Sequence, residues 1–411
     1  MTFEEARIAL AATGLFGPEQ TVPAFTDEPK IPAFLCYPSA RAATVCEVTQ
    51  GVNGSGFHPD PERARLQAGA ECLERLSLMN PPEDELVRGR PADIPGSIDP
   101  LVFRAHSHTQ FSNFVEFERQ VAGCSFRWWP ATAVGTDEQV LLPAQLVFLS
   151  SIVSDEVLVR REQITTGAAL GPIGTDIAFA SGLLEAVERD AAMAAYLKRT
   201  SPPRIAHLAP KLQDTVDYFR RYHLEPHFLD VTTDLGIPSV VAVTVDRTGL
   251  GPAINIGTAA DLTYEDAILS ALYESIQTRH PGRLFRNPSS EPAPNGDGPS
   301  NIEQRFDEWY PVERIPDLAF WLETSQRVGY DELASRSMTL EQAKHAILDR
   351  GFHIYVADVT LPELKQAGFE VLRVVVPELH PLYLTEANKM LYSVHHGEIP
   401  NDPSLPPHPV L

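Results

Sequence analysis

Small and apolar residues recur at helical spacing in three segments of the chain, residues 60–78, 175–198 and 263–279. Asp60 is a good N-cap and Pro61 a good first helical residue, while Thr263 caps the third segment. The second segment is apolar on most of its sides, which is typical of a buried helix. The pattern therefore predicts three helices, of which the middle one lies inside the protein.

Shorter stretches have the composition of β-strands. Residues 126–149 predict a hairpin that turns at Gly135-Thr136-Asp137-Glu138, and Pro130 and Pro143 favour edge positions or irregularities in it. Further strands are predicted at residues 227–231, 239–245, 253–257, 354–359 and 371–376. Because helices and strands are mixed along the chain, we expect the α/β (α+β) class.

Two segments fit neither kind of element. Residues 287–301, NPSSEPAPNGDGPSN, have no hydrophobic anchor, and we expect a mobile loop there. Residues 403–411 form a proline-rich tail that cannot be helical or sit inside a sheet, so it should be extended. The composition of this tail alone favours a frayed terminus.

Composition narrows the class of protein. The 411 residues are 43% hydrophobic and 21% charged, values typical of a soluble globular protein. The net charge of −22 argues against a nucleic-acid surface but not against a small anion such as ATP, because bound cations can mediate that contact. The four cysteines have no zinc spacing, which favours a cytoplasmic protein with reduced thiols. We find no signal peptide and no apolar run long enough to span a membrane.

One short acidic pattern occurs in all three predicted helices. The copies are Glu71-Cys-Leu-Glu74-Arg75, Glu185-Ala-Val-Glu188-Arg189 and Glu274-Ser-Ile-Gln277-Thr-Arg279. For a single copy, ordinary surface ion pairs between residues four apart are the simpler explanation. The second copy lies on the helix that we expect to be buried, where an acid pair is costly unless cations compensate it. We therefore predict carboxylates gathered around Mg²⁺ that carries a nucleotide, with the arginines neutralising phosphate charge or orienting the acids.

Other chemistry has weaker support. The glycine-bearing loop before the second helix, Gly167 to Gly174, could present backbone amides to a phosphate, and Gly54-Ser55-Gly56 is similarly suggestive. The chain has no HExxH and no Gly-x-Ser-x-Gly motif. His395 and His396 are adjacent and do not share a helix face, and His408 in the tail is interpreted as solvated.

The chain resembles the YcaO family. The most specific motif is Gly-Leu-Leu-Glu185-Ala-Val-Glu188-Arg189-Asp190-Ala191, supported by the stretch from Gly56 to Arg75, by Glu274 to Arg279 and by Val374-Val-Val-Pro377-Glu-Leu-His-Pro381. The resemblance covers about residue 50 to the end, which implies a catalytic domain at 51–411 and an N-terminal extension at 1–50. It also implies the YcaO fold, with mixed β-sheets and buried acidic helices that line a nucleotide site.

The resemblance implies ATP-dependent activation of a peptide backbone amide, in which the amide oxygen takes the γ-phosphate and phosphate then leaves. With a Cys, Ser or Thr side chain as nucleophile, the product is a thiazoline or oxazoline. Residues 186–205 and the tail Pro406-Pro-His-Pro409 favour this azoline branch, although the tail ends Val410-Leu411 where the family pattern has a further proline. Amidine formation by macrocyclisation, thioamide formation and a non-catalytic peptide-binding scaffold are the alternatives.

Residue roles follow from the same resemblance. It implies Mg²⁺ binding by Glu71, Glu74, Glu185, Glu188 and Glu274, ATP binding by Ser55, Arg75, Thr166, Gly167, Arg189, Gln277 and Arg279, and a catalytic tail with His408 and Pro409. Two departures stand out: Ser55 replaces a lysine that is frequent in the family, and Thr165-Thr166-Gly167 replaces Ser-Asn-Gly.

Partners are implied as well. The substrate is expected to be a ribosomally made precursor peptide. Residues 1–50 are too short for a leader-binding or E1-like domain, so we expect either a separate partner of that kind or a stand-alone enzyme similar to those of bottromycin-type pathways. A homodimer is one assembly that the resemblance allows.

Overall fold

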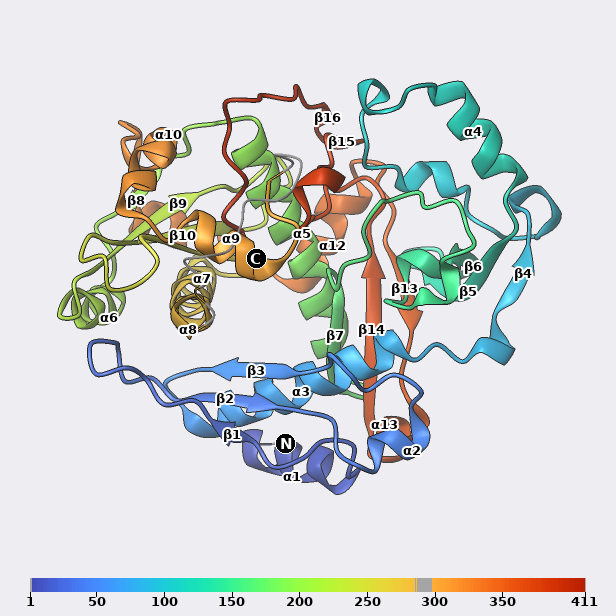
Figure 1. Cartoon of the computed structure of the whole chain (residues 1–411), viewed down its shortest axis with the longest axis horizontal. Helices are drawn as coiled ribbons and strands as arrows, with labels where there is room; N and C mark the ends of the chain where they lie inside the picture. Colours follow the sequence, from blue (N-terminus) through green and yellow to red (C-terminus); the bar gives the residue numbers. More distant parts are fainter. Residues whose placement is uncertain (1, 285, 287–297, 411) are drawn as a thin grey trace.

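The computed structural model describes residues 2–284, 286 and 298–410. Most of the predicted mobile loop, residues 287–297, lies outside the described residues. The long helix α5 (Ile177–Leu197) runs through the centre of the molecule, between two large sheets, and a small sheet lies below them (Figure 1). The mixed α/β class is confirmed.

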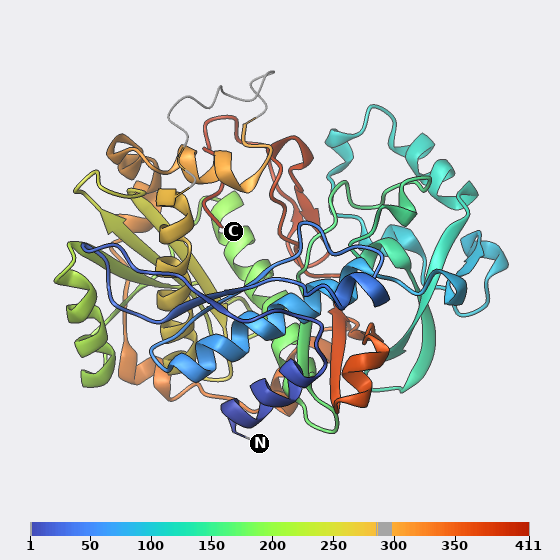
Figure 2. The same ribbon diagram turned by 60° about the horizontal axis from the view of Figure 1, so that its bottom comes forward.

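The small sheet joins the first fifty residues to the rest of the chain. Its order is β1-β2-β3, and β2 pairs antiparallel with β3, so Leu35 lies opposite Ser55. Helix α3 packs on this sheet and crosses the junction of the two large sheets, with α1 on its outer side (Figure 2). The elements are α1 (Phe3–Ala12), β1 (Gln20–Thr21), β2 (Ala33–Cys36), α2 (Ala42–Val45), β3 (Gly54–Phe57) and α3 (Pro61–Met79).

The five-stranded sheet has the order β11-β10-β9-β8-β12, antiparallel except for the parallel pair β8 and β12. Every residue of β10 and β11 is buried, because α5 and α7 pack against these strands. The elements are β8 (Arg204–Ala206), α6 (Pro210–Arg220), β9 (Leu224–Asp230), β10 (Ser239–Asp246), β11 (Ile254–Ala260), α7 (Tyr264–Gln277), α8 (Arg279–Leu284), α9 (Ile302–Glu308), α10 (Ala319–Leu322), β12 (Arg327–Gly329) and α11 (Tyr330–Ala334).

The six-stranded sheet has the order β4-β5-β13-β14-β7, with β6 paired to β5. The predicted hairpin is confirmed, but its return strand ends at Pro143 because a 3₁₀ turn begins at Ala144. The elements are β4 (Val87–Gly89), α4 (Phe114–Gly123), β5 (Phe126–Ala133), β6 (Glu138–Pro143), β7 (Ala168–Pro172), α12 (Leu340–Leu348), β13 (Tyr355–Asp358), α13 (Pro362–Gln366) and β14 (Phe369–Val375). A separate two-stranded hairpin is formed by β15 (Tyr392–Ser393) and β16 (Gly397–Glu398).

The predicted helices are confirmed with small changes at their ends. Asp60 caps α3 by accepting hydrogen bonds from the backbone of Glu62 and Arg63, and Thr263 caps α7 through Asp266. Helix α5 buries all residues from Asp190 to Leu197, as expected of a helix that is apolar on most sides.

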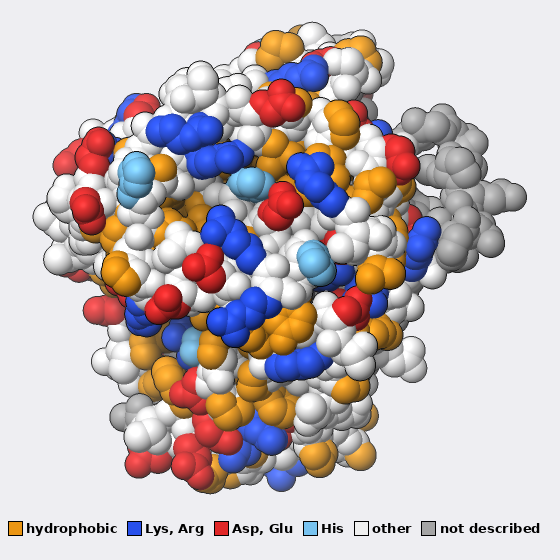
Figure 3. Space-filling model, turned by 90° about the vertical axis from the view of Figure 1, so that its left-hand side faces the viewer, with side chains coloured by type: hydrophobic (Ala, Val, Ile, Leu, Met, Phe, Trp, Pro, Cys, Tyr) orange, Lys and Arg blue, Asp and Glu red, His pale blue; other side chains and the backbone are white. Residues whose placement is uncertain are grey.

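The surface is not uniformly acidic. Figure 3 shows the face formed by the end of the molecule that carries α6, with Lys, Arg and His side chains spread among acidic and apolar ones. A groove on this side of β9 is lined by Arg220, His223, His227 and Arg247. The four cysteines are free thiols, and no helix in the described part of the chain has the length and apolar character needed to cross a membrane.

Candidate nucleotide and metal site

The acidic residues of the three helices come together at the centre of the molecule. Glu71 and Glu74 project from α3, Glu185 and Glu188 from α5, and Glu274 from α7. Within each pair the residues are three apart and share one helix face. We call these five residues the glutamate cluster.

Backbone N–H groups hold three of these carboxylates in place. The Ser55 N–H donates to Glu71 Oε2 at 2.5 Å, and the Thr258 N–H donates to Glu274 Oε2 at the same distance. The Gly167 N–H donates to Glu185 Oε2 at 2.8 Å. A glutamate of the cluster therefore anchors each helix to the strand or loop that precedes it.

Very close contact between strand and helix backbones makes these hydrogen bonds reachable. A Cβ atom on Gly54 would lie 2.1 Å from the Ala68 carbonyl oxygen, and one on Gly257 would lie 2.0 Å from the Ala271 carbonyl oxygen. Ala68 and Ala271 each stand three residues before the anchored glutamate of their helix. The same strand–helix contact therefore occurs twice, once for α3 and once for α7.

We expect Gly257→Ala to destabilise the protein by about 1–3 kcal/mol, the range for overpacked cores, because its Cβ would meet backbone that cannot rotate away. Gly329→Ala is the matched control, since Gly329 lies in the same sheet and its Cβ would have nothing within 4 Å. Its effect should stay within about 0.5 kcal/mol. Urea denaturation measures both, and equal effects of the two substitutions would refute the close-contact explanation.

Thr258 connects two helices within the glutamate cluster. Its hydroxyl donates to Glu188 Oε1 at 2.6 Å, while its N–H holds Glu274. Arg189 lies among the same acids, with ion-pair distances of 3.3 Å to Glu188, 3.8 Å to Glu185 and 3.9 Å to Glu274. The acidic residues of α5 and α7 thus form one connected group.

The cluster holds five carboxyl groups beside two arginines, Arg75 and Arg189. Burial raises the pKa of Glu188, an effect that Arg189 opposes and Glu274 reinforces. Burial, together with Glu185 and Glu71, raises the pKa of Glu74 well above its ordinary range. Arg373 is the second buried cation nearby, but it is engaged with the carbonyl groups of Ile164 and Thr165.

These properties fit magnesium. The donors are carboxylate oxygens, which Mg²⁺ prefers, and they come from three rigid helices. Glu71, Glu185, Glu188 and Glu274 keep between 14% and 29% of their side-chain surface exposed. Ions from solvent can therefore reach these carboxyl groups, and the repulsion between the carboxylates favours the binding of divalent cations.

Several residues predicted to bind ATP lie beside Glu71. The Ser55 hydroxyl donates to Glu71 at 2.9 Å and accepts from the Gln277 amide at 2.8 Å. Arg75 forms an ion pair with Glu71 at 2.6 Å and donates to Asn53. Ser55 thus links α3 to α7, although a serine carries no charge for a phosphate. Thr166 precedes Gly167 in the loop beside Glu185.

Arg279, also predicted to bind ATP, pairs with carboxylates outside this group. Its guanidinium is 2% exposed and pairs with Asp246 at 2.7 Å and with Glu28 at 3.4 Å. Glu28 belongs to the segment expected to be an N-terminal extension. Because two buried carboxylates already neutralise Arg279, we assign it a structural role.

The C-terminal tail is packed into the protein, so the prediction of a frayed terminus is wrong. His408 is fully buried rather than solvated, and its Nε2 lies 2.7 Å from the Tyr383 carbonyl oxygen. Burial lowers the pKa of His408 well below its ordinary value, and Arg305 lowers it further. Pro409 lines a small cavity with Ile256 of β11 and Thr278, which follows α7. The tail thus reaches the strand that carries Thr258.

Some functional candidates were missed from the sequence. Thr258 stands 16 residues before Glu274, the same separation as between Ser55 and Glu71, and this repeated spacing was a usable signal. Asp190, His395 and His396 meet although the two histidines are adjacent, because they lie in a hairpin turn rather than a helix.

Comparison with known proteins agrees with this arrangement. Residues 53–380 match the family model for YcaO cyclodehydratase, ATP- and Mg²⁺-binding. None of the curated proteins matches the chain.

Solved structures share the fold. A heterocyclase in complex with substrate and cofactor superimposes with a TM-score of 0.75 at 18% identity, over 95% of this chain and 53% of that one. This chain thus spans about half the length of that heterocyclase. YcaO from Methanopyrus kandleri, bound with AMPPCP and Mg²⁺, has a TM-score of 0.67 at 20% identity, over 92% of this chain and 91% of that one. The E. coli microcin synthetase McbBCD complex has a TM-score of 0.63 at 14% identity, over 88% of each chain.

Proposed function

Since the chain belongs to the YcaO family, we propose that it is an ATP- and Mg²⁺-dependent enzyme that activates a backbone amide of a ribosomally made precursor peptide. The proposed product is a thiazoline or oxazoline, formed by cyclodehydration of a Cys, Ser or Thr residue. The observation that carries the proposal is the glutamate cluster, in which three helices bring five carboxyl groups together beside only two arginines, Arg75 and Arg189.

Within this proposal the glutamate cluster holds Mg²⁺, and Ser55, Arg75 and Gln277 line the nucleotide end of the site. ATP supplies the phosphoryl group that makes the amide oxygen a leaving group. Arg189 supplies positive charge beside the acids of α5 and α7. Such chemistry depends on positioning and charge neutralisation rather than on a protein nucleophile.

The C-terminal tail is proposed to form part of the peptide side of the site. Its support is the position of Pro409, which lines a cavity together with Ile256. Ile256 is two residues before Thr258 on the same strand, so both side chains face the same side of the sheet. His408 acts in this proposal by holding the tail rather than as a solvated base, because its ring is buried against Tyr383.

Partner proteins are part of the proposal as well. The similar heterocyclase is described with its substrate, and the McbBCD complex is described with pro-MccB17 bound. Since the McbBCD assembly is a complex of several proteins, we propose that a leader-binding or E1-like protein takes part in delivering the peptide to this chain.

The test is incubation with ATP, Mg²⁺ and a candidate Cys/Ser/Thr-rich precursor, read by mass spectrometry and phosphate release. Azoline formation should remove one water per phosphate released and, for a thiazoline, should remove a thiol that iodoacetamide can label. If the peptide loses water but iodoacetamide still labels all of its thiols, the product is an oxazoline or an amidine. Tandem mass spectrometry distinguishes these two products. A mass increase would indicate a thioamide. Absence of Mg²⁺-dependent nucleotide binding in calorimetry would instead identify a non-catalytic scaffold.

A further inference from the structure

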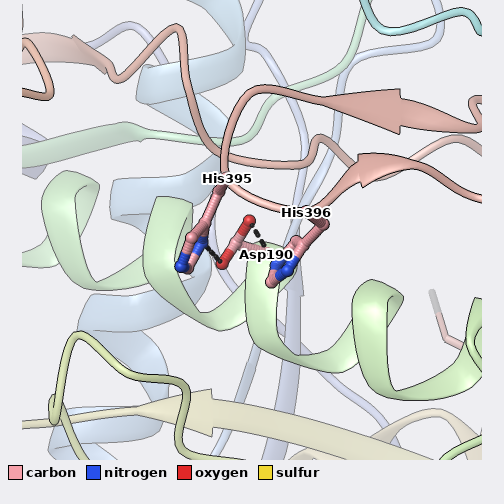
Figure 4. Close-up of side chains that lie close together, drawn as sticks. All are labelled: Asp190, His395 and His396. Atoms are coloured by element: carbon pink, nitrogen blue, oxygen red, sulfur yellow. Dashed lines mark hydrogen bonds and ion pairs between the residues drawn. The ribbon is translucent and has the colours of Figure 1, made fainter.

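Three buried side chains outside the glutamate cluster form a second group of potential ligands. Asp190 lies on α5, and His395 and His396 lie in the turn between β15 and β16 (Figure 4). Asp190 Oδ2 is 2.8 Å from His395 Nδ1, and Asp190 Oδ1 is 3.0 Å from His396 Nε2. Each of the three residues offers one possible ligand atom, and these three atoms all lie within 4.8 Å of one another.

Burial makes this group unlike a surface cluster. The Asp190 side chain is 0% exposed, His395 3% and His396 10%. Asp190 Oδ1 is the ion-pair partner of His396 Nε2, although the angle of this contact is not that of a regular hydrogen bond. The group thus places two imidazoles and one carboxylate close together in a largely buried position.

The outer contacts resemble those that orient metal ligands. His395 Nε2 lies 2.7 Å from Asp234 Oδ1, so a carboxylate faces the ring nitrogen opposite to Asp190. The His380 N–H donates to Asp190 Oδ1 at 2.7 Å. A histidine that binds a metal ordinarily donates its other N–H to a carboxylate or carbonyl, and this contact fixes the ring.

The other charged side chains beside the two histidines, Lys198 and Asp234, do not block the access of an ion from solvent. Lys198 Nζ is 3.2 Å from His396 Nδ1, but Lys198 is exposed and can turn toward solvent. Asp234 also pairs with Arg350 and keeps 56% of its side chain exposed. The group is thus buried on the α5 side and close to solvent on the Asp234 side.

We propose that Asp190, His395 and His396 bind a divalent transition-metal ion of the Zn²⁺ type, which fastens the β15–β16 hairpin to α5. Two imidazoles and one carboxylate suit zinc-type ions, whereas Mg²⁺ prefers oxygen donors alone. Ligand atoms around tetrahedral zinc are about 3.3 Å apart, so the observed 2.8 and 3.0 Å require a small separation of the side chains. The site is distinct from the glutamate cluster and does not depend on the proposed function.

Metal analysis of the full-length protein tests the proposal. The protein is stripped with EDTA, incubated with Zn²⁺ in the presence of excess Mg²⁺ to occupy the glutamate cluster, desalted, and measured by inductively coupled plasma mass spectrometry. We expect about one tightly held Zn²⁺ per chain. His396→Gln should lose it, and His353→Gln should keep it, because the His353 imidazole pairs with the Glu378 carboxylate and is not one of the three ligands. Zn²⁺ should also raise the melting temperature of the wild type but not of His396→Gln.

A second variant covers the case in which His396→Gln does not fold. Asp234→Asn replaces an exposed side chain and leaves all three ligands intact, so it should weaken Zn²⁺ binding about 10- to 100-fold, the effect of losing an outer-shell partner. Co²⁺ in place of Zn²⁺ gives a visible spectrum that reports nitrogen ligands without any activity assay. A wild type that retains no Zn²⁺, or a His396→Gln variant that retains as much, would show instead that the three side chains form a metal-free hydrogen-bonded link.

Discussion

Replacing Glu188 by glutamine is expected to abolish ATP consumption while the protein stays folded. Glutamine keeps the oxygen that accepts from the Thr258 hydroxyl and removes only the charge. Burial raises the pKa of Glu188, which means that its charge is costly in the fold, so the variant should melt no lower than the wild type. Loss of even an outer-shell partner of a metal costs about 10- to 100-fold, and we expect loss of a ligand to cost at least about 100-fold in turnover.

Phosphate release with excess ATP and Mg²⁺ measures this effect, and thermal unfolding without ligand measures stability. Glu265→Gln is the matched control, because Glu265 lies on the exposed side of α7 and should leave both properties unchanged. If Glu188→Gln hydrolysed ATP at the wild-type rate, the assignment of the glutamate cluster to metal binding would fail.

Deleting residues 406–411 is expected to destabilise the protein strongly. The Tyr196 hydroxyl donates to the Pro406 carbonyl at 2.9 Å, and the Trp309 indole N–H donates to the Pro407 carbonyl at 3.0 Å. Arg305, fully buried, donates to the His408 carbonyl. Burial of one valine contributes about 1.5–3 kcal/mol and each hydrogen bond about 1 kcal/mol, so the loss of these contacts and of buried Val410 should exceed about 3 kcal/mol.

The denaturation midpoint in urea checks this result. Ser404→Ala is the control for a change in the same segment, since Ser404 is exposed and bonds mainly within its own turn. Pro409→Ala tests the proposed role of the tail in catalysis apart from its role in folding stability. It removes only the ring that lines the cavity with Ile256 and keeps the backbone contacts of the tail. A truncated chain that unfolds at the wild-type midpoint would show that the tail is not an integral part of the fold.

The sequence predicted the elements whose signals are local. Helices α3 and α7 have side-chain caps at Asp60 and Thr263, and the buried state of α5 follows from its composition. Glutamates three residues apart share one helix face. Because an acid pair on the buried helix α5 needs compensating cations, the gathering of acids from three helices could be predicted as well. The family resemblance supplied the role that we propose for these acids, the binding of Mg²⁺.

The surroundings of Arg279, His408 and Asp190 depend on partners that are distant in the sequence. Arg279 is neutralised by Glu28, which lies 251 residues earlier, and no local pattern reveals that pair. His408 is buried because Tyr383 and Arg305 cover it, whereas its own proline-rich neighbourhood resembles a loose end. The link from Asp190 to His395 spans 205 residues and depends on where the β15–β16 turn lies.

The contact of Gly54 with Ala68 and of Gly257 with Ala271 joins main chain to main chain. The distances of Glu71 and Glu274 from their neighbouring strands are therefore set by contact between main-chain atoms, not by the shapes of the apolar side chains around them. We therefore expect substitutions among the surrounding apolar side chains to leave the positions of these two carboxylates unchanged as long as Gly54 and Gly257 are kept.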